Sequence, residues 1–232
     1  MKNLINQRGN LTLMALTAAA LLAATQTQAQ SVTYNFTDGT SDGWANAGFS
    51  STPLATVSNI GGQNYIFLSF NNNAFQVGND TSTSAGNLAG FNAAMAAAWA
   101  NPSGYAITYT YSVNTAAITG ATFLQLGTYV NPGSGFYAQD YGADQVQLNG
   151  TQLASGSVIT GTVVVPFTVF NIASDTATET SYRLGLIENT TSGATGGVYF
   201  TSISVAPVPE PATLSLCGLG LAGLAFLRRR KA

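Results

Sequence analysis

Residues 105–114 read Tyr-Ala-Ile-Thr-Tyr-Thr-Tyr-Ser-Val-Asn, and this stretch decides the fold class. Bulky apolar side chains stand at every second position from Tyr105 to Val113, and small or polar side chains stand between them. Because successive side chains of a β-strand point to opposite faces, the alternation predicts a strand that buries one face and leaves the other in water.

Similar short stretches recur along the chain between segments rich in Gly, Asn, Ser and Thr. We expect strands near residues 32–37, 64–70, 121–130, 162–170, 182–187 and 197–205. This pattern predicts an all-β fold, a β-sandwich or jelly roll. Within an alanine-rich run, Phe91, Met95 and Trp99 recur at every fourth position, which predicts one short helix over an end of the sandwich.

Two positions carry local backbone signals. Asn149 and Gly150 stand between alternating segments of residues 146–153, and this pair predicts a type I′ hairpin turn. Pro166 has no N–H to donate to a neighbouring strand, so we expect its strand at a sheet edge or with a bulge.

The basic residues are concentrated at the two ends of the chain. Of the 7 Lys and Arg residues, only Arg183 lies between residues 9 and 227. The acidic side chains of residues 30–208 are Asp38, Asp42, Asp80, Asp140, Asp144, Asp175, Glu179 and Glu188. Binding of nucleic acid phosphates requires Lys and Arg, so we expect no nucleic-acid partner.

Histidine is absent from the chain, and Cys217 is its single cysteine. One cysteine cannot form a disulfide within the domain. Zinc and blue-copper sites depend on His and Cys ligands, so the composition excludes them.

The N-terminus has the layout of a secretory signal. Lys2 and Arg8 precede an apolar stretch, 11–24, and small residues follow at Thr27 and Ala29. We therefore expect residues 1–29 to be a signal peptide cleaved near Ala29, with an uncleaved membrane anchor as the alternative.

The C-terminus carries a second apolar segment. Residues 212–227 contain no charge, and Arg228, Arg229, Arg230 and Lys231 follow them. As a helix this segment spans about 24 Å, somewhat less than the roughly 30 Å of a bilayer core. Arginine stems reach the interface and close the gap, so we expect a single transmembrane helix with its basic end in the cytoplasm.

Pro209-Glu210-Pro211, followed by this apolar helix and a terminal arginine cluster, resembles the PEP-CTERM sorting signal of bacteria. The resemblance implies a transient hold in the inner membrane and cleavage by an exosortase, a membrane-embedded thiol protease. It also implies delivery to the outer surface or extracellular matrix, in an exopolysaccharide or biofilm context. We expect the sorting signal to cover 207–232 and the sandwich domain 30–206; an ordinary tail anchor is the alternative.

Both ends of the domain carry a further, short resemblance. Residues 34–44 and 197–205 resemble the first and last strands of carbohydrate-binding-module-like jelly rolls, whose termini often pair. Many such modules have an Asp-Asn pair in the last strand, where this chain has Thr201-Ser202.

Candidate glycan-binding residues lie in Gly-rich stretches. Sugar recognition needs exposed aromatic faces together with amide or carboxylate side chains. The residues that meet this description are Trp44, Tyr137, Tyr141, Asp140 and Asp144. Such loop aromatics can equally fold back over the core, so that alternative stays open.

The carboxylates do not by themselves indicate a cofactor, because eight acids in one domain supply some suitable pair by chance. Asp38 with Asp42 is a weak calcium candidate that does not fit the EF-hand loop, and Asx turns explain the same pattern. A two-carboxylate glycoside hydrolase, with Asp140 or Glu188 as a candidate acid, is the enzyme alternative. No nucleophile and base motif supports it, so we expect a non-enzymatic structural or adhesive surface protein, with a carbohydrate-binding module as the first alternative.

Overall fold

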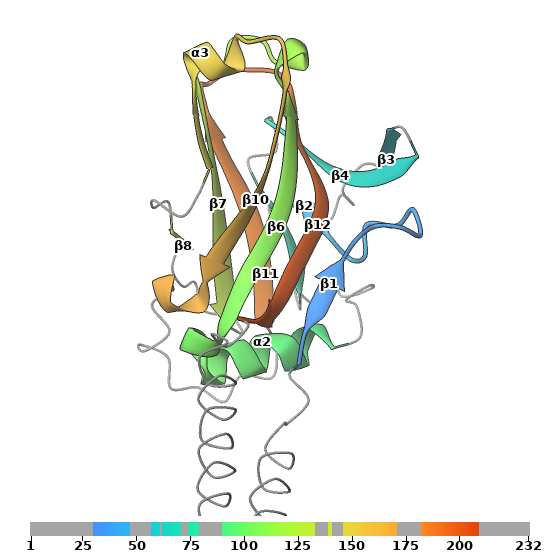
Figure 1. Cartoon of the computed structure of the whole chain (residues 1–232), viewed down its shortest axis with the longest axis vertical. Helices are drawn as coiled ribbons and strands as arrows, with labels where there is room; N and C mark the ends of the chain where they lie inside the picture. The colour runs from blue at the N-terminus through green and yellow to red at the C-terminus, as the bar shows by residue number, and fades with distance from the viewer. Residues whose placement is uncertain are drawn as a thin grey trace, which may run out of the picture.

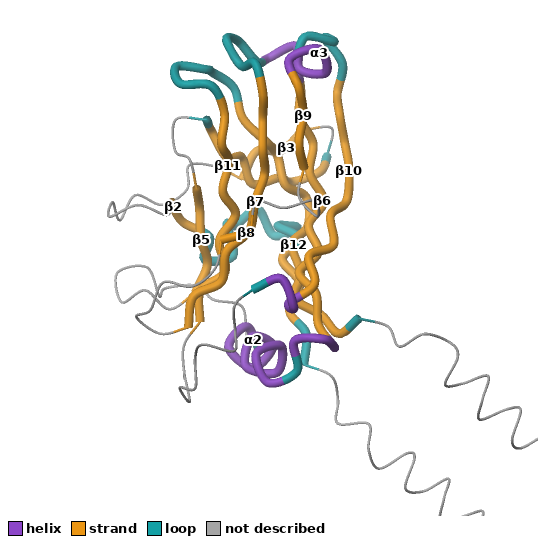
Figure 2. The backbone as a smooth tube through the Cα atoms, turned by 90° about the vertical axis from the view of Figure 1, so that its left-hand side faces the viewer, coloured by secondary structure: helices purple, strands orange, loops and turns teal. Residues whose placement is uncertain are grey.

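The computed structural model describes residues 30–46, 57–60, 62–70, 74–78, 90–132, 139–140, 146–170 and 182–208. These residues form two six-stranded antiparallel sheets, which Figure 2 shows as two layers with a helix at one end. The expected signal peptide, 1–29, and the expected sorting helix, 212–227, lie outside the described residues. No helix among the described residues is long and apolar enough to cross a membrane.

The first sheet, sheet A, has the strand order β10-β6-β12-β4-β3, and β1 pairs with β12 beside β4. Its strands are β1 (Val32–Tyr34), β3 (Val57–Ile60), β4 (Gln63–Ser69), β6 (Tyr105–Asn114), β10 (Val158–Pro166) and β12 (Gly197–Pro207). Strand β12 is the central strand of this sheet, and it is hydrogen-bonded to β1, β4 and β6 (Figure 1).

The second sheet, sheet B, has the order β2-β5-β11-β7-β8, and β9 also pairs with β7. Its strands are β2 (Ala45–Asn46), β5 (Ala74–Gly78), β7 (Phe123–Pro132), β8 (Gln139–Asp140), β9 (Val146–Asn149) and β11 (Tyr182–Thr190). The short strands β2, β3, β5 and β8 have no counterpart among the expected strands.

The alternation of residues 105–114 is confirmed. Strand β6 has the same bounds, and its odd-numbered side chains from Tyr105 to Val113 are buried. Thr108, Thr110 and Ser112 lie on the outer face and are partly exposed. On the inner face the rings of Tyr109 and Phe200 meet with their centroids 5.8 Å apart. One hydrophobic cluster contains inner-face residues of both sheets, so the two sheets share a single core.

The helix and the edge strand are also confirmed. Helix α2 (Phe91–Ala100) buries Phe91, Ala94, Met95 and Ala98, a stripe with helical spacing, and lies across one end of the sandwich (Figure 1). Strand β10 ends at Pro166 and is an edge strand of sheet A, the position expected for a strand with a residue that has no N–H to donate.

Both ends of the described domain emerge next to α2. Val32 of β1 is paired with Val205 of β12, which confirms the pairing of first and last strands that the resemblance implies. The N–H of Val208 donates to the carbonyl of Gly104 at 2.8 Å. The opposite end of β12, at Gly197, lies at the far end of the sandwich (Figure 1).

The prediction of a hairpin turn at Asn149 is wrong. Asn149 has φ −91° and ψ 170°, and it begins the one-turn helix α3 (Gly150–Leu153). Its side chain accepts from the N–H of Gln152 at 3.0 Å, and the Gln152 side chain accepts from the N–H of Asn149 at 2.9 Å. This capping box satisfies two helix N–H groups, and it favours a helix start over a tight turn.

Replacing Asn149 by alanine should therefore destabilise the protein by about 1 kcal/mol, because it removes the helix cap. Urea denaturation measures the loss. Gln147→Ala, an exposed position two residues earlier in β9, is the control and should change stability by less than about 0.5 kcal/mol. Equal losses in the two variants would contradict the capping role.

Candidate functional site

The predicted sugar-binding role of Trp44 is not compatible with its position. Its side chain is 1% exposed and packs edge-on against the ring of Tyr34, with the centroids 5.5 Å apart. Asp42 and Gly43 have positive φ values of 51° and 84°, and the N–H of Trp44 donates to the carbonyl of Ser41 at 2.8 Å. This tight turn directs the indole into the core, which is the alternative that the sequence left open.

The other aromatic candidates are not placed by the structure. Tyr137, Tyr141 and Asp144 lie outside the described residues. Asp140 lies in β8, where its backbone pairs with Thr128, but its side chain is not described.

Asp38 and Asp42 are tied together by Thr40. The N–H and the hydroxyl of Thr40 both lie 2.9 Å from Oδ1 of Asp38, and the hydroxyl is 3.1 Å from Oδ1 of Asp42. The Thr40 backbone N–H lowers the pKa of Asp38, whereas burial raises the pKa of Asp42. The loop is thus an Asx turn, and the described residues contain no group of three or more metal-binding His, Cys, Asp or Glu side chains.

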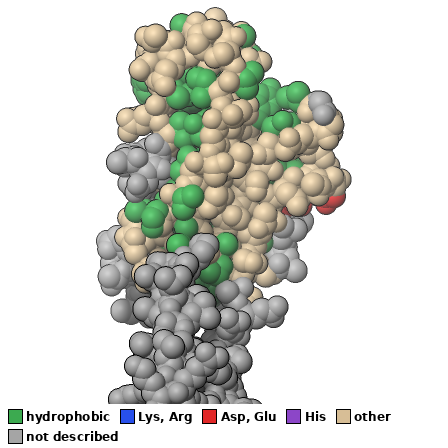
Figure 3. Space-filling view, in the orientation of Figure 1, with side chains coloured by type: hydrophobic (Ala, Val, Ile, Leu, Met, Phe, Trp, Pro, Cys, Tyr) green, Lys and Arg blue, Asp and Glu red, His purple; other side chains and the backbone are tan. Residues whose placement is uncertain are grey.

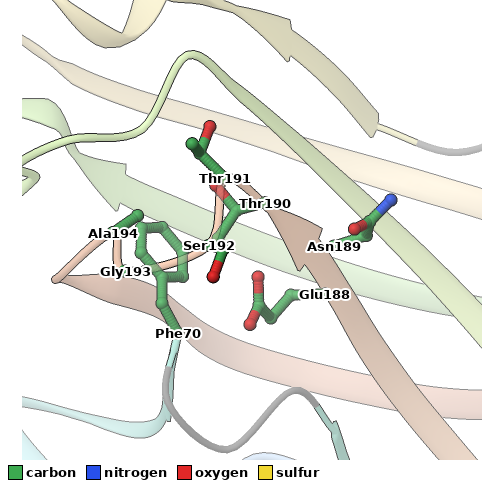
Figure 4. A pocket seen from close by; sticks show the side chains of 8 residues that line it. All are labelled: Phe70, Glu188, Asn189, Thr190, Thr191, Ser192, Gly193 and Ala194. Atoms are coloured by element: carbon green, nitrogen blue, oxygen red, sulfur yellow. The ribbon is translucent and has the colours of Figure 1, made fainter.

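A pocket of about 360 Å³ lies at the end of the sandwich opposite α2. It is lined by Phe70, at the end of β4, by Glu188, Asn189 and Thr190 of β11, and by residues 191–194 of the loop that follows. Figure 4 shows the carboxylate of Glu188 directed toward the space beside the Phe70 ring and the 190–192 segment, while the side chain of Asn189 points away.

Glu188 occupies a core position of β11. The inward-facing row of this strand contains Leu184 and Leu186, both almost fully buried, and Glu188 is the next member of the row. Its backbone partner on β7 is Leu126, which is also buried. Asn189 faces outward instead, where its side-chain amide donates to the side chain of Gln125 at 2.8 Å.

The carboxylate of Glu188 is buried without a hydrogen-bonding partner among the described residues. The residue is 5% exposed, and both of its carboxylate oxygens are buried. Burial alone raises the pKa of Glu188 from 4.5 to about 7. A charged carboxylate without a partner lowers stability in a low-dielectric site. Packing of the core therefore does not explain why a glutamate stands at position 188.

The pocket does not assemble a pair of carboxylates from the described residues. Glu188 is the one acidic side chain among the residues that line it. Glycoside hydrolysis by the usual route requires two carboxyl groups that flank the bond. The described part of the pocket therefore provides one acid and several hydroxyl groups.

A group of aromatic side chains that sequence reasoning missed lies on the outer face of sheet A. Tyr65 and Phe67 of β4 and Tyr199 of β12 are all partly exposed. The ring of Tyr199 lies 4.7 Å from that of Phe67 and 5.9 Å from that of Tyr65, measured between centroids. The alternation along β4 was visible in the sequence. The position of Tyr199 beside Phe67, however, depends on the register in which β12 pairs with β4.

Hydroxyl side chains continue this face across the sheet. Tyr199 pairs with Ser112 of β6, which pairs with Thr160 of β10. In the next row Thr110 and Thr162 pair, and their hydroxyl groups are 3.0 Å apart. The six strands of sheet A contain no Asp, Glu, Lys or Arg. In Figure 3, which views this side, no Lys or Arg is visible among the described residues.

Comparison with protein families identifies the C-terminal segment. Residues 207–231 match the PEP-CTERM protein-sorting motif, as the Pro209-Glu210-Pro211 sequence, the apolar segment and the arginine cluster predicted. The motif is that of exported proteins that an exosortase processes at the membrane. The curated proteins contain no match to the chain.

Two solved structures similar to the domain are carbohydrate-binding modules. A CBM28 module specific for non-crystalline cellulose has a TM-score of 0.46 and 16% identity, and the alignment covers 72% of this chain and 89% of that chain. The CBM22-1 xylan-binding domain of Xyn10C from Paenibacillus barcinonensis has a TM-score of 0.41 and 11% identity, with 78% and 95% covered.

The raised pKa of Glu188 makes stability depend on pH. Between about pH 4.5 and 7 the folded protein holds a proton that the unfolded chain releases, so this carboxyl lowers stability as pH rises. Glu188→Gln is similar in size but uncharged, and it should be about 1 to 3 kcal/mol more stable than the wild type above pH 7. Below about pH 4.5 the two proteins should be equally stable, as urea denaturation across this range can measure.

Asp38→Asn serves as the control for this pH series. The pKa of Asp38 is lowered from 3.8, so from about pH 5 upward its carboxylate is ionised in both the folded and the unfolded protein, and over that part of the series the stability difference from wild type should stay constant. A Glu188→Gln difference that is also independent of pH would show that Glu188 titrates normally.

Proposed function

We propose that the protein is an adhesive component of the extracellular polysaccharide matrix or the outer cell surface, and that it binds glycan through the outer face of sheet A. The observation that carries the proposal is the group formed by Tyr65, Phe67 and Tyr199 on a sheet without charged residues. An exosortase-type protease of the inner membrane and a polysaccharide are its partners.

The chemistry of this face suits a hydrated neutral glycan. A sugar presents C–H patches, which stack on aromatic rings, and hydroxyl groups, which need donors and acceptors. The row Phe67, Tyr199, Ser112 and Thr160 crosses four neighbouring strands. Three interstrand spacings of about 4.8 Å make this row about 14 Å long, which is long enough for an oligosaccharide segment.

The attachment of the two targeting segments supports a role at a surface. Residues 30 and 208 both lie at the α2 end of the sandwich (Figure 1). Tyr199 stands near the start of β12, toward the opposite end of the sheet. During a transient hold in the membrane by residues 212–227, the aromatic group would therefore lie in the half of the domain farther from the attachment point.

Tyr199→Ala should weaken binding to the extracellular polysaccharide of the producing cells about tenfold, because it removes the ring that both other aromatic residues contact. Affinity electrophoresis of the mature protein through gels that contain the polymer measures the effect. The matched control is Phe123→Ala, which removes a 37% exposed aromatic residue from sheet B and should leave migration unchanged. Equal retardation of the Tyr199→Ala variant and the wild type would refute binding at this face.

Processing at both ends should be visible in the intact mass of the protein from culture supernatant. We expect a chain that begins near Gln30 and ends near the Pro209-Glu210-Pro211 motif. A protein found in the cytosol with both ends present would contradict export.

A further inference from the structure

The pocket around Glu188 is a second feature of the domain, separate from the outer face of sheet A. Glu188 and Thr190 face the interior between the sheets, and Phe70 lies on the inner side of β4. Tyr65 and Phe67, by contrast, belong to the outer side of the same strand. The pocket and the aromatic group are thus on opposite sides of sheet A at the same end.

The described part of the domain places no cation beside Glu188. Arg183 is the single basic residue between residues 9 and 227, and histidine is absent. Arg183 stands five positions before Glu188 on β11, in the outward-facing row, so it lies on the other side of the sheet. A cation that pairs with the ionised Glu188 would therefore come from outside the domain.

The other walls of the pocket suit an organic molecule. Phe70 offers an aromatic face, and such a face attracts both sugar C–H groups and cations. The hydroxyl groups of Thr190 and Thr191 are already oriented: Thr190 donates to the carbonyl of Phe123, and Thr191 accepts from the N–H of Thr122 at 2.9 Å. The volume of about 360 Å³ is within the range of small-molecule sites.

We propose that this pocket binds the protonated amine of an amino sugar, a hexosamine unit without an N-acetyl group, with Glu188 as the counter-ion and Phe70 as the stacking surface. The proposal deepens the glycan-binding function and rests on it for the source of the ligand. A carboxylate and an aromatic ring together recognise a cation on a ring that is otherwise neutral and polar.

A metal ion fits the same walls less well. Calcium takes six to eight oxygen ligands in proteins, usually from several carboxylates and carbonyl groups. Glu188 is the one carboxylate among the lining residues, and the carbonyl of Thr191 already accepts from the N–H of Ala194 at 3.0 Å. The aromatic wall provides no oxygen ligand for such an ion.

The test is isothermal titration calorimetry of the mature protein at pH 7, where the amine of glucosamine is still largely protonated, with four probes. Glucosamine has both the amine and the ring, N-acetylglucosamine has the ring without the charge, methylammonium has the charge without the ring, and calcium chloride tests a metal. Glucosamine should bind at least about tenfold more tightly than each of the others. Glu188→Gln should lose this preference, whereas Asp38→Asn, a carboxylate outside the pocket, should keep it.

Circular dichroism and the denaturation midpoint show whether Glu188→Gln is folded, and Glu188→Asp, which keeps the charge, should retain part of the binding. Equal binding of glucosamine and N-acetylglucosamine would overturn the proposal, and so would a preference for calcium. Methylammonium that binds as tightly as glucosamine would overturn the assignment to a sugar.

The two proposals fail separately. Tyr199→Ala should leave glucosamine binding unchanged, because Tyr199 is not among the residues that line the pocket. Loss of polymer binding in that variant with intact glucosamine binding supports both sites. Polymer binding that depends on Tyr199 in a protein that does not bind glucosamine would refute the pocket alone.

Discussion

The passage of the chain from β11 to β12 is the constraint on which the rest of the structure depends. Residues 191–196 connect the central strand of sheet B to the central strand of sheet A. The carbonyl of Gly196 accepts from the N–H of Phe70 at 3.1 Å, and Thr195 pairs with Thr119. A Cβ on Gly197 would lie 2.2 Å from the carbonyl oxygen of Leu68, so only glycine permits this close approach. These contacts hold the connection against the end of β4 and against the segment that precedes β7.

The position of the pocket follows from this connection. The inward row of β11 runs through Leu184, Leu186 and Glu188 toward the segment in which the chain crosses between the sheets. Glu188 follows the buried Leu186 on this row and lies opposite the buried Leu126, three residues before the crossing segment begins. The aromatic group outside sheet A depends on the register of β12 with β4, because β12 brings Tyr199 beside Phe67 only while Gly197 stays opposite Ser69. Both proposed sites thus share a structural origin at the end remote from the sorting motif.

The sequence predicted regular features well and context-dependent ones poorly. The alternation of 105–114 and the spacing of Phe91 and Met95 are local patterns, and the structure has the strand and the helix they predict. The Asn149 prediction was wrong because a helix cap competes with a turn, although Gln152 three residues later was a readable signal. The burial of Glu188 could also have been predicted, because this acid continues the alternating row of Leu184 and Leu186. The aromatic group of Tyr65, Phe67 and Tyr199 could not be predicted. A bulge between Phe200 and Ser202 shifts the register of β12 relative to β6, and this bulge cannot be recognised in the alternation of the sequence.

The location of Arg183 has a consequence for the lifetime of the domain outside the cell. Proteases of the trypsin type cut after Lys or Arg, and residues 9–227 contain this one such position. Arg183 is paired on one side with Gly78 of β5 and on the other with Asn131 of β7. A protease needs an extended, unpaired segment of several residues to fit its cleft, and β11 cannot supply one while the sheet is intact. The folded domain is therefore resistant to this whole class of digestive enzymes without a single disulfide.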